Sequence, residues 1–379
     1  MNTNKLKRLI EPLIFLTIFF CVFGVIGNRM GLSNMLNTIM QTSYRLLLDT
    51  VFFLMGITVL SGALGKLLVE FGVVRMLEKI LRPLMKPLFG LPGVAALGAV
   101  LTFLSDNPAI IALAKDKQFG QYFKKYQLIS LTNFGTAFGM GLIVVVYMTS
   151  LGFGKGALVG LLGAVVGSIV STRLMQRFTL KSHPEYLNLP AYEKQVEVDE
   201  DECHKKESTF IRALNAILDG GKSGVDLGLA IIPGVLVIST AVMMMTFGPS
   251  GEDGQYMGVA YEGVPVLPYL ADKINVLFDW LFGFQFPELV SFPITALGAV
   301  GAALGLLPEF IARGFVDNNV IAVFTAIGMC WSGYLSTHTA MLDSLGYRRL
   351  TGKAIGAHTI GGLCAGIVAH WAFVVLSLI

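Results

Sequence analysis

Residues 97–108 read Leu-Gly-Ala-Val-Leu-Thr-Phe-Leu-Ser-Asp-Asn-Pro, and residues 297–308 read Leu-Gly-Ala-Val-Gly-Ala-Ala-Leu-Gly-Leu-Leu-Pro. The two stretches match at a constant offset of 200 residues, and Pro92 recurs one place off as Pro293. Each stretch is apolar and is broken by a proline beside a polar or acidic residue. An apolar helix that is broken once in each half of a chain is typical of the binding site of a transporter built from two repeats.

The composition places the chain in a membrane. It has 379 residues, of which 54% are hydrophobic and 14% are charged, and its mean hydropathy is +0.69. A soluble domain normally carries about 25% charged residues. Several apolar runs here reach the roughly 20 residues that a helix needs to cross a bilayer. The sequence therefore predicts an all-α polytopic membrane protein whose surroundings are the lipid bilayer.

Seven apolar runs are long enough to be spans. The first follows a short basic segment, but it is long for a signal peptide and no small-residue cleavage site follows it, so we predict a retained N-terminal span. Amphipathic stretches are expected between spans or along the membrane surface, at 30–45, 71–88, 209–222 and 270–286. The predicted spans lie at about 9–27, 46–70, 126–150, 154–172, 225–246, 318–341 and 355–378.

The charge pattern predicts the topology, because short cytoplasmic loops of membrane proteins are enriched in Lys and Arg. Basic residues flank the broken segment at 90–119 on both sides, which requires it to enter and leave on the cytoplasmic side as a re-entrant hairpin. Acidic residues flank the second broken segment, at 289–316, so it is expected to enter and leave on the opposite side. In the alternative, both broken segments are full spans, and the basic residues at 115–125 then lie outside.

The predicted fold is an inverted repeat of span, hairpin, span and span, preceded by an extra N-terminal span. The N-terminus is expected in the cytoplasm and the C-terminus outside. An acidic cluster at 193–202 marks the longest polar connector, which divides the halves. The expected parts are an N-terminal span and connector at 1–45, a first repeat at 46–172, a polar cytoplasmic connector at 173–222 and a second repeat at 223–379.

The two breaks carry the first candidate binding residues, Ser105, Asp106, Asn107 and Glu309. A charged side chain at the centre of a membrane costs about 2.5–3.5 kcal/mol, so it usually faces a cavity or a partner. Pro108 removes a backbone donor and disfavours helix at the residue before it, which frees carbonyl groups for a ligand. Ser105 or Asp106 could instead cap a helix that begins at Pro108. Glu309 could either favour a helix dipole or hold a coupling ion or a solute hydroxyl.

The spans that follow the hairpins carry the second set of candidates. Residues 131–139 are polar and glycine-rich in an otherwise apolar span, and at the offset of 200 they meet residues 331–339. Ser and Thr in such helices often bond only to their own backbone, but two matched clusters beside broken hairpins favour a shared cavity. His338 could also titrate and couple protons. The candidates in these spans are Thr132, Asn133, Thr136, Ser332, Ser336, Thr337 and His338.

Residues 98–114, with the break at Ser105-Asp106-Asn107-Pro108, and residues 297–312 resemble the nucleoside-recognition, or Gate, segment. That segment occurs in concentrative nucleoside transporters, in spore maturation membrane proteins and in the membrane part of bacterial ferrous iron transporters. The resemblance implies a bacterial inner-membrane protein in which hairpin tips and adjacent unwound helices hold the solute and a coupling ion. The matching positions here are Ser105, Asp106, Asn107, Asn133, Thr136, Glu309, Ser336, Thr337 and His338.

The sequence as a whole predicts a secondary transporter of a small polar solute, such as a nucleoside or a base. Coupling to Na⁺ or H⁺ is expected, with no other cofactor, no metal site and no nucleic-acid partner, and a homo-oligomer would be consistent with the class. The alternative is a membrane component that does not transport and that acts with a partner protein. An enzyme is not expected, because no nucleophile and base occur together in a recognisable motif.

Overall fold

The computed structural model describes residues 3–193 and 208–378. The predicted number of spans is confirmed, since seven helical segments in this part of the chain are long and apolar enough to cross a membrane. They are Ile10–Met30, Leu32–Glu70, Lys125–Ser150, Gly154–Ser182, Thr209–Thr246, Asn318–Ser344 and Arg348–Ser377. Most of the acidic cluster predicted at 193–202 lies outside the described residues.

After the N-terminal helix α1 (Thr3–Met30), each half of the chain forms one long helix, a broken hairpin, a broken span and a second long helix. The first half contains α2 (Leu32–Arg45), η1 (Leu46–Val51), α3 (Phe52–Glu70), α4 (Val73–Leu84), η2 (Met85–Phe89), α5 (Ala95–Leu104), α6 (Pro108–Lys115), α7 (Lys117–Gly120), α8 (Lys125–Thr136), α9 (Gly141–Ser150), α10 (Gly154–Ser182) and η3 (Pro184–Leu187). The second half contains α11 (Thr209–Pro233), η4 (Gly234–Ser239), α12 (Thr240–Thr246), α13 (Val266–Asp272), α14 (Asn275–Phe282), η5 (Pro287–Val290), α15 (Ser291–Gly298), α16 (Val300–Leu304), α17 (Leu307–Ala312), α18 (Asn318–Cys330), α19 (Tyr334–Ser344), η6 (Arg348–Leu350) and α20 (Thr351–Ser377).

Equivalent helices of the two halves pack against each other in opposite directions. Along α3 and α11, Gly62 faces Gly220 and Thr58 faces Gly224, so residue numbers rise on one helix as they fall on the other. Helices in a membrane associate through small residues that let their backbones approach closely. A Cβ atom at Gly220 would overlap the carbonyl oxygen of Gly62.

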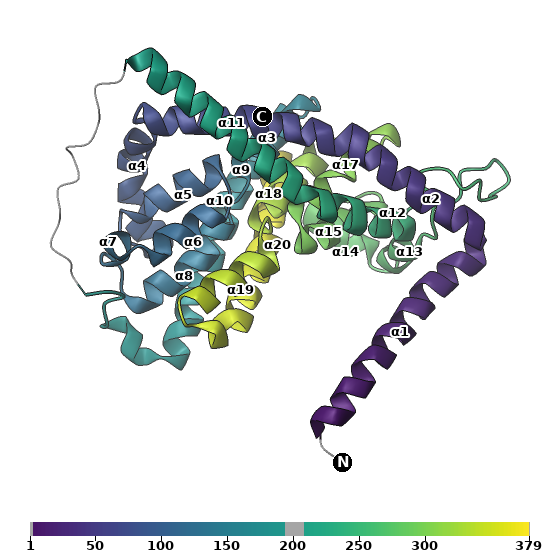
Figure 1. Ribbon diagram of the computed structural model, residues 1–379, viewed down its shortest axis with the longest axis horizontal. Helices are drawn as coiled ribbons and strands as arrows, with labels where there is room; N and C mark the ends of the chain where they lie inside the picture. Colours follow the sequence, from purple (N-terminus) through teal and green to yellow (C-terminus); the bar gives the residue numbers. More distant parts are fainter. Residues whose placement is uncertain (1–2, 194–207, 379) are drawn as a thin grey trace.

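The pair α10 and α20 repeats this arrangement. Gly167 faces Gly361, and Gly163 faces Ala365 and Ala369, so these helices also run antiparallel at a close approach. Because both equivalent pairs are antiparallel, the two halves have opposite orientation. The inverted repeat is therefore confirmed, with its extra N-terminal span α1, which projects from the body of the molecule (Figure 1).

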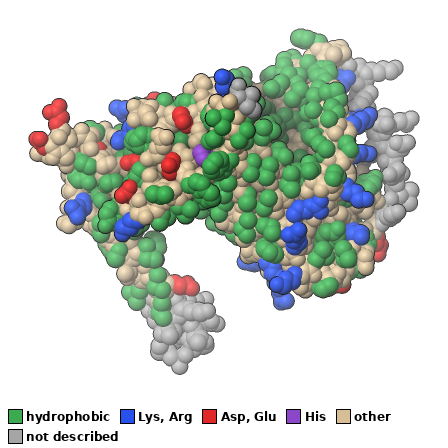
Figure 2. Space-filling model, turned by 180° about the vertical axis from the view of Figure 1, so that it is seen from behind, with side chains coloured by type: hydrophobic (Ala, Val, Ile, Leu, Met, Phe, Trp, Pro, Cys, Tyr) green, Lys and Arg blue, Asp and Glu red, His purple; other side chains and the backbone are tan. Residues whose placement is uncertain are grey.

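The two broken hairpins lie on opposite sides of the molecule (Figure 1). The first consists of α5 and α6, with Pro108 as the first residue of α6, where its missing N–H costs nothing. The second is more broken than the sequence suggested, because its first arm is interrupted again at Ala299, whose backbone is extended. Lys and Arg side chains on one face of the molecule gather toward the end formed by α4 and α7 (Figure 2).

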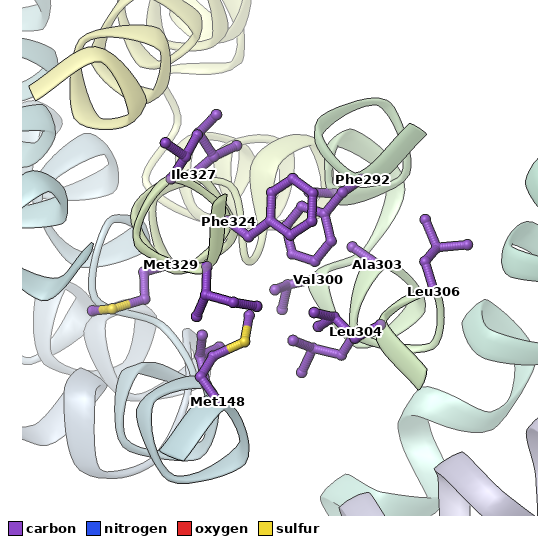
Figure 3. Close-up of a cluster of buried hydrophobic side chains, with 14 of the residues drawn as sticks. Met148, Phe292, Val300, Ala303, Leu304, Leu306, Phe324, Ile327 and Met329 are labelled. Atoms are coloured by element: carbon purple, nitrogen blue, oxygen red, sulfur yellow. The ribbon is translucent and has the colours of Figure 1, made fainter. Parts of the chain in front are cut away.

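The tip of the second hairpin is built into the largest hydrophobic core. Val300, Ala303, Leu304 and Leu306 are all buried, and the first three point toward side chains from α9, α15 and α18 (Figure 3). The rings of Phe292 and Phe324 stack there with their centroids 4.0 Å apart. The second tip is thus apolar and packed, unlike the polar first tip.

Both spans that follow a hairpin are unwound near their middle. The first is interrupted between α8 and α9, where Met140 adopts a left-handed backbone with φ of 54°, and the second is interrupted at Trp331-Ser332-Gly333, between α18 and α19. Helices α8 and α18 begin at residues 125 and 318 and end at 136 and 330, so their offset is 193 to 194.

The offset of 200 that pairs the polar clusters in the sequence is therefore wrong in this region. The reason is the connector after each hairpin, because the first half has the extra short helix α7 where the second half passes directly to α18. In the structural register Gly139 corresponds to Gly333, and Thr136 corresponds to Cys330.

Two further boundaries differ from the sequence expectation. The stretch at 30–45 is not a separate connector, since α2, η1 and α3 form one helical segment through the π-helical turn at Leu46–Val51. The stretch at 209–222 is likewise continuous with the following span, through the π-helical turn at Gly234–Ser239. Amphipathicity predicted surface helices here, but the glycines of α3 and α11 pack these segments together instead.

Replacing Gly220 by alanine tests the close crossing of α3 and α11. We expect Gly220→Ala to lower the free energy of unfolding by about 1–3 kcal/mol, the usual cost of overpacking. Gly221→Ala is the matched control, because a Cβ atom there meets only Val59, at an ordinary 3.7 Å. Alanine favours helix by up to about 1 kcal/mol, so thermal unfolding in detergent should move in opposite directions for the two variants. Equal shifts of the unfolding temperature in the two variants would contradict the close crossing of α3 and α11.

Candidate functional site

The first hairpin tip presents three polar side chains in different directions. Ser105 donates its hydroxyl hydrogen to the carbonyl oxygen of Leu101, at 2.6 Å, on its own helix. Asp106 interacts with the backbone N–H of Asn107, but its Oδ1 atom is buried and has no hydrogen-bond partner in the described part of the chain. No side chain caps α6 at its N-cap residue, Asn107. An unpartnered buried carboxylate oxygen calls for a ligand.

A cavity of about 610 Å³ opens beside this tip. Its walls are the crossing of α3 and α11 on one side and the first hairpin with Ile143 of α9 on the other. Ser105 and Asp106 lie on its wall, facing the crossing helices. Three charged side chains and three hydroxyl groups line an otherwise apolar space; these are Lys66, Asp106, Asp226, Thr58, Ser105 and Ser223.

Sequence reasoning missed the part of this wall that α3 and α11 contribute. Lys66 and Asp226 lie on exposed positions of helices whose apolar runs are otherwise long. A charge inside an apolar span was the available signal, the same one that identified Asp106. We applied this signal to the broken segments and not to these two helices.

The other polar side chain of the tip, Asn107, points into the two unwound segments. Its Nδ2 atom donates to Oγ of Ser332, at 3.2 Å, and Ser332 donates in turn to the carbonyl oxygen of Thr136, also at 3.2 Å. Glycine is required at both breaks, since a Cβ atom at Gly139 or Gly333 would overlap the amide of Asn107. We call this contact, made by Asn107, Thr136, Ser332 and the two glycines, the tip junction.

The tip junction joins residues that the sequence placed in one site. Thr337 belongs to it as well, because its Oγ1 atom lies beside Gly333. The Oδ1 atom of Asn107 is buried without a hydrogen-bond partner among residues 3–193 and 208–378. The junction thus brings together oxygen atoms of Asn107, Thr136, Ser332 and Thr337.

A buried chain of hydrogen bonds supports the second break. The break removes the helical partner of the Cys330 carbonyl, because the N–H of Tyr334 bonds to Trp331 instead. The Nε2–H group of His358 donates to that carbonyl. The Nδ1 atom of His358 must then accept from Ser171, at 2.8 Å, which fixes the tautomer of the ring.

Asn133 completes this chain from α8. Its Nδ2 atom donates to Oγ of Ser171 and to the carbonyl oxygen of Ala354, both at 2.9 Å. Asn133, Ser171 and His358 are essentially fully buried, so each bond is formed away from water. The structure therefore gives Asn133 a supporting contact, and Ser171 and His358 are functional candidates that the sequence did not indicate.

His338 lies next to this chain. Its Nδ1–H group donates to the carbonyl oxygen of Tyr334, at 2.6 Å, so Nε2 is the unprotonated nitrogen. Nε2 is buried and lacks a partner within the described residues, and the ring centroid lies 4.5 Å from that of His358. The two histidines are twenty residues apart, and only the packing of α19 on α20 brings them together.

Besides Asn133 and His338, three of the residues expected at the site are not brought to the cavity or to the tip junction. Glu309 pairs with Arg313 on its own helix, with Oε1 and Nε 2.6 Å apart. Ser336 is exposed on α19, and Thr132 is fully buried with its Oγ1 atom unpartnered in the described chain. The offset of 200 had paired Ser336 with Thr136 and Thr132 with Ser332, a register that the structure does not have.

Comparison with known proteins agrees with this geometry. Residues 43–154 match the family described as Gate, nucleoside recognition. The matched stretch runs through α3, the first hairpin and the unwound span α8–α9, and so contains the polar tip and half of the tip junction. The resemblance inferred from the two breaks is confirmed.

The fold is that of the concentrative nucleoside transporter CNTnw. An outward-facing variant of CNTnw superposes with a TM-score of 0.52 and 14% identity, over 97% of this chain and 84% of that one. CNTnw in an inward-facing, substrate-bound state gives a TM-score of 0.51 and 14% identity, over 83% and 74% of the two chains.

A curated relative is an uncharacterized protein of Alkalihalophilus pseudofirmus, 23% identical over 289 residues. The match covers 73% of this chain and 58% of that protein. The chain therefore spans less than two thirds of the length of this relative.

Removing the His358 side-chain bond to the second break should destabilise the protein. We expect His358→Ala to lower the free energy of unfolding by at least about 1–3 kcal/mol, because a buried carbonyl loses its donor. His183→Ala is the control, since the His183 ring is partly exposed and contacts Glu185 and Tyr186 at the surface, away from both breaks. Thermal unfolding in detergent measures both; a wild-type midpoint for His358→Ala would show that the bond does not hold the break.

Proposed function

We propose that this protein is a secondary transporter of a small polar solute of the nucleoside or base class. The Gate segment and the fold shared with CNTnw support this proposal. CNTnw has been solved in an outward-facing state and in an inward-facing, substrate-bound state.

The observation that carries the proposal is the position of Asp106. A carboxylate with an unpartnered oxygen lies on the wall of a 610 Å³ cavity, at the tip of a helix that is broken within the membrane. Cavities of about 300–1,000 Å³ are typical of small-molecule sites. Keeping a charge there is costly, so a solute that donates hydrogen bonds to it is the most direct explanation.

The cavity wall also indicates the chemistry of the solute. Leu101, Leu104 and Leu227 offer apolar surface for the face of a ring, while Asp106 accepts hydrogen bonds. The hydroxyl groups of Thr58 and Ser223 donate to backbone carbonyl oxygens, so their oxygen atoms can accept from a solute. A nucleoside or base has an apolar ring face together with N–H or O–H donors. Lys66 and Asp226 add one charge of each sign, which favours a neutral or zwitterionic solute.

Transport in this proposal uses the first hairpin as a moving wall. The cavity lies between that hairpin and the crossing of α3 and α11, which the glycines Gly62 and Gly220 hold closely packed. The tip junction ties the hairpin to both unwound segments, so the hairpin and these spans would move together relative to the crossing helices. Such rocking of one part around a fixed site is how alternating access works in repeat-built transporters.

Two sites could carry the coupling ion. The oxygen atoms of Asn107, Thr136, Ser332 and Thr337 converge at the tip junction, and oxygen donors suit Na⁺; the unpartnered Oδ1 of Asn107 fits this role. His338 offers an unprotonated Nε2 atom for a proton instead. Bound Na⁺ would neutralise the negative end of the oxygen dipoles and hold the tip against the breaks.

Uptake into proteoliposomes tests the proposal. The purified protein is assayed with labelled nucleosides and bases under an imposed Na⁺ or H⁺ gradient. We expect gradient-driven uptake of at least one solute, and a roughly tenfold or greater loss with Asp106→Asn, because a hydrogen bond to a charged group is worth about 1.5–3 kcal/mol.

Asp253→Asn is the control for this assay, since Asp253 lies in an exposed loop and its replacement should leave uptake unchanged. Wild-type uptake by Asp106→Asn would contradict the assigned site. An absence of uptake across the whole panel, together with a protein partner that co-purifies in fixed proportion, would overturn transport in favour of a membrane assembly component.

A further inference from the structure

A second cavity, of about 340 Å³, lies between the first arm of the second hairpin and the short helices α13 and α14. Helices α18 and α20 form its remaining walls. It shares no lining residue with the cavity at the first hairpin, so it is a separate feature of the described chain. We call it the hairpin groove.

The hairpin groove has no group that would hold water. Its lining side chains are hydrocarbon, with the single exception of Trp331 at the second break. The indole N–H of Trp331 already donates to the carbonyl oxygen of His358, at 3.2 Å. A cavity whose polar groups are all satisfied stays dry and takes apolar occupants.

The groove opens to the surroundings of the protein through large apolar side chains. Leu270, Ile274 and Ile294 line it and are 54%, 51% and 43% exposed. On a helix bundle in a bilayer, such an opening faces acyl chains. Lipid tails are as apolar as leucine, so nothing drives these helices together to close it.

Side chains near the mouth are those typical of the membrane–water interface. Tyr269 is exposed and lies under the ammonium group of Lys273, which is 4.8 Å from the ring centroid. Trp280 of α14 is 61% exposed and contacts Trp371 of α20. Tyr and Trp gather at the level of lipid headgroups, and Lys273 follows the groove residue Ala271 by two positions.

We propose that the hairpin groove binds one acyl chain of a membrane phospholipid, whose headgroup rests near Lys273 and Tyr269. The chain would lie along Ile294 and Leu297 of α15 and would end near Trp331. The bound acyl chain would stabilise the first arm of the second hairpin. That arm is interrupted at Ala299, and the acyl chain would give it contacts that its own short helices do not supply. The same occupant touches the second break through Trp331.

Quenching of Trp331 fluorescence tests this assignment. The chain has three tryptophans, so Trp280→Phe and Trp371→Phe leave Trp331 alone. The full chain is reconstituted in vesicles of phosphatidylcholine brominated on its acyl chains, and in matched vesicles of ordinary phosphatidylcholine. Trp331 is only 4% exposed, so we expect quenching that depends on a chain inside the groove.

Filling the groove should remove that quenching. Ala271→Phe occupies the groove from α13 and should lose most of the quenching, while Leu335→Phe, on an exposed site of α19 outside the groove, should keep it. Leu297→Phe is a second filling variant in case Ala271→Phe does not fold. Quenching that persists in the folded filling variants overturns the proposal. So does an absence of quenching in the protein that keeps Trp331 alone and has an unfilled groove.

The source of the chain needs its own comparison. Brominated stearic acid is added to vesicles of ordinary phosphatidylcholine at the same mole fraction of brominated chains. Weaker quenching than with the brominated phospholipid is the expected result. Stronger quenching would assign the groove to a free fatty acid and would contradict the phospholipid assignment.

Discussion

Backbone carbonyl and N–H groups freed inside a membrane must find partners within the protein, because the hydrocarbon offers none. This constraint shapes the centre of the molecule. Two spans are unwound there. The break in the second span leaves the carbonyl of Cys330 without its helical partner, and the imidazole of His358 satisfies it. At the first break the carbonyl of Thr136 keeps a bond from the N–H of Gly139 and accepts a second one from the hydroxyl of Ser332. The first break thus depends on Ser332 of the second half, and the His358 ring that holds the second break is oriented by Ser171 of the first half, so neither half can form its centre alone.

The position of the first hairpin follows from these breaks. The side chain of Asn107 bonds to Ser332 between Gly139 and Gly333. The neighbouring residue Asp106 therefore lies on the other side of the tip, on the wall of the cavity. The second tip is held through its backbone, because the hydroxyl of Tyr147 donates to the carbonyl oxygen of Leu304, at 3.2 Å, and its leucine side chains are packed into the largest core. The repeat is thus symmetric in its backbone and asymmetric in its chemistry. One hairpin carries the candidate binding group, while the other is an apolar element beside a groove for lipid.

Much of the fold was predictable, because apolar length and the distribution of charge report directly on membrane crossing. The seven spans, the two hairpins and the inversion follow from those signals. The site was predictable only in part. Asp106 and Asn107 were found because a charge and a proline interrupt an apolar run, but His358 and Ser171 lie in unremarkable helices and meet only through the packing of α10 on α20. The pairing of the polar clusters failed because the connector that contains the short helix α7 is longer than the connector after the second hairpin. A match at one constant offset does not reveal this difference in connector length.

Accessibility of the first tip is the most direct test of the central claim, that a solute occupies the cavity at Asp106. The four cysteines of the chain are replaced, and Ser105→Cys places one thiol on the cavity wall. The protein in proteoliposomes is treated with a membrane-impermeant thiol reagent, with and without each nucleoside or base. We expect labelling that the transported solute slows in proportion to its occupancy, and no such protection at a cysteine placed at the exposed position Asp253. Labelling at Ser105→Cys that no solute in the panel alters would contradict the account.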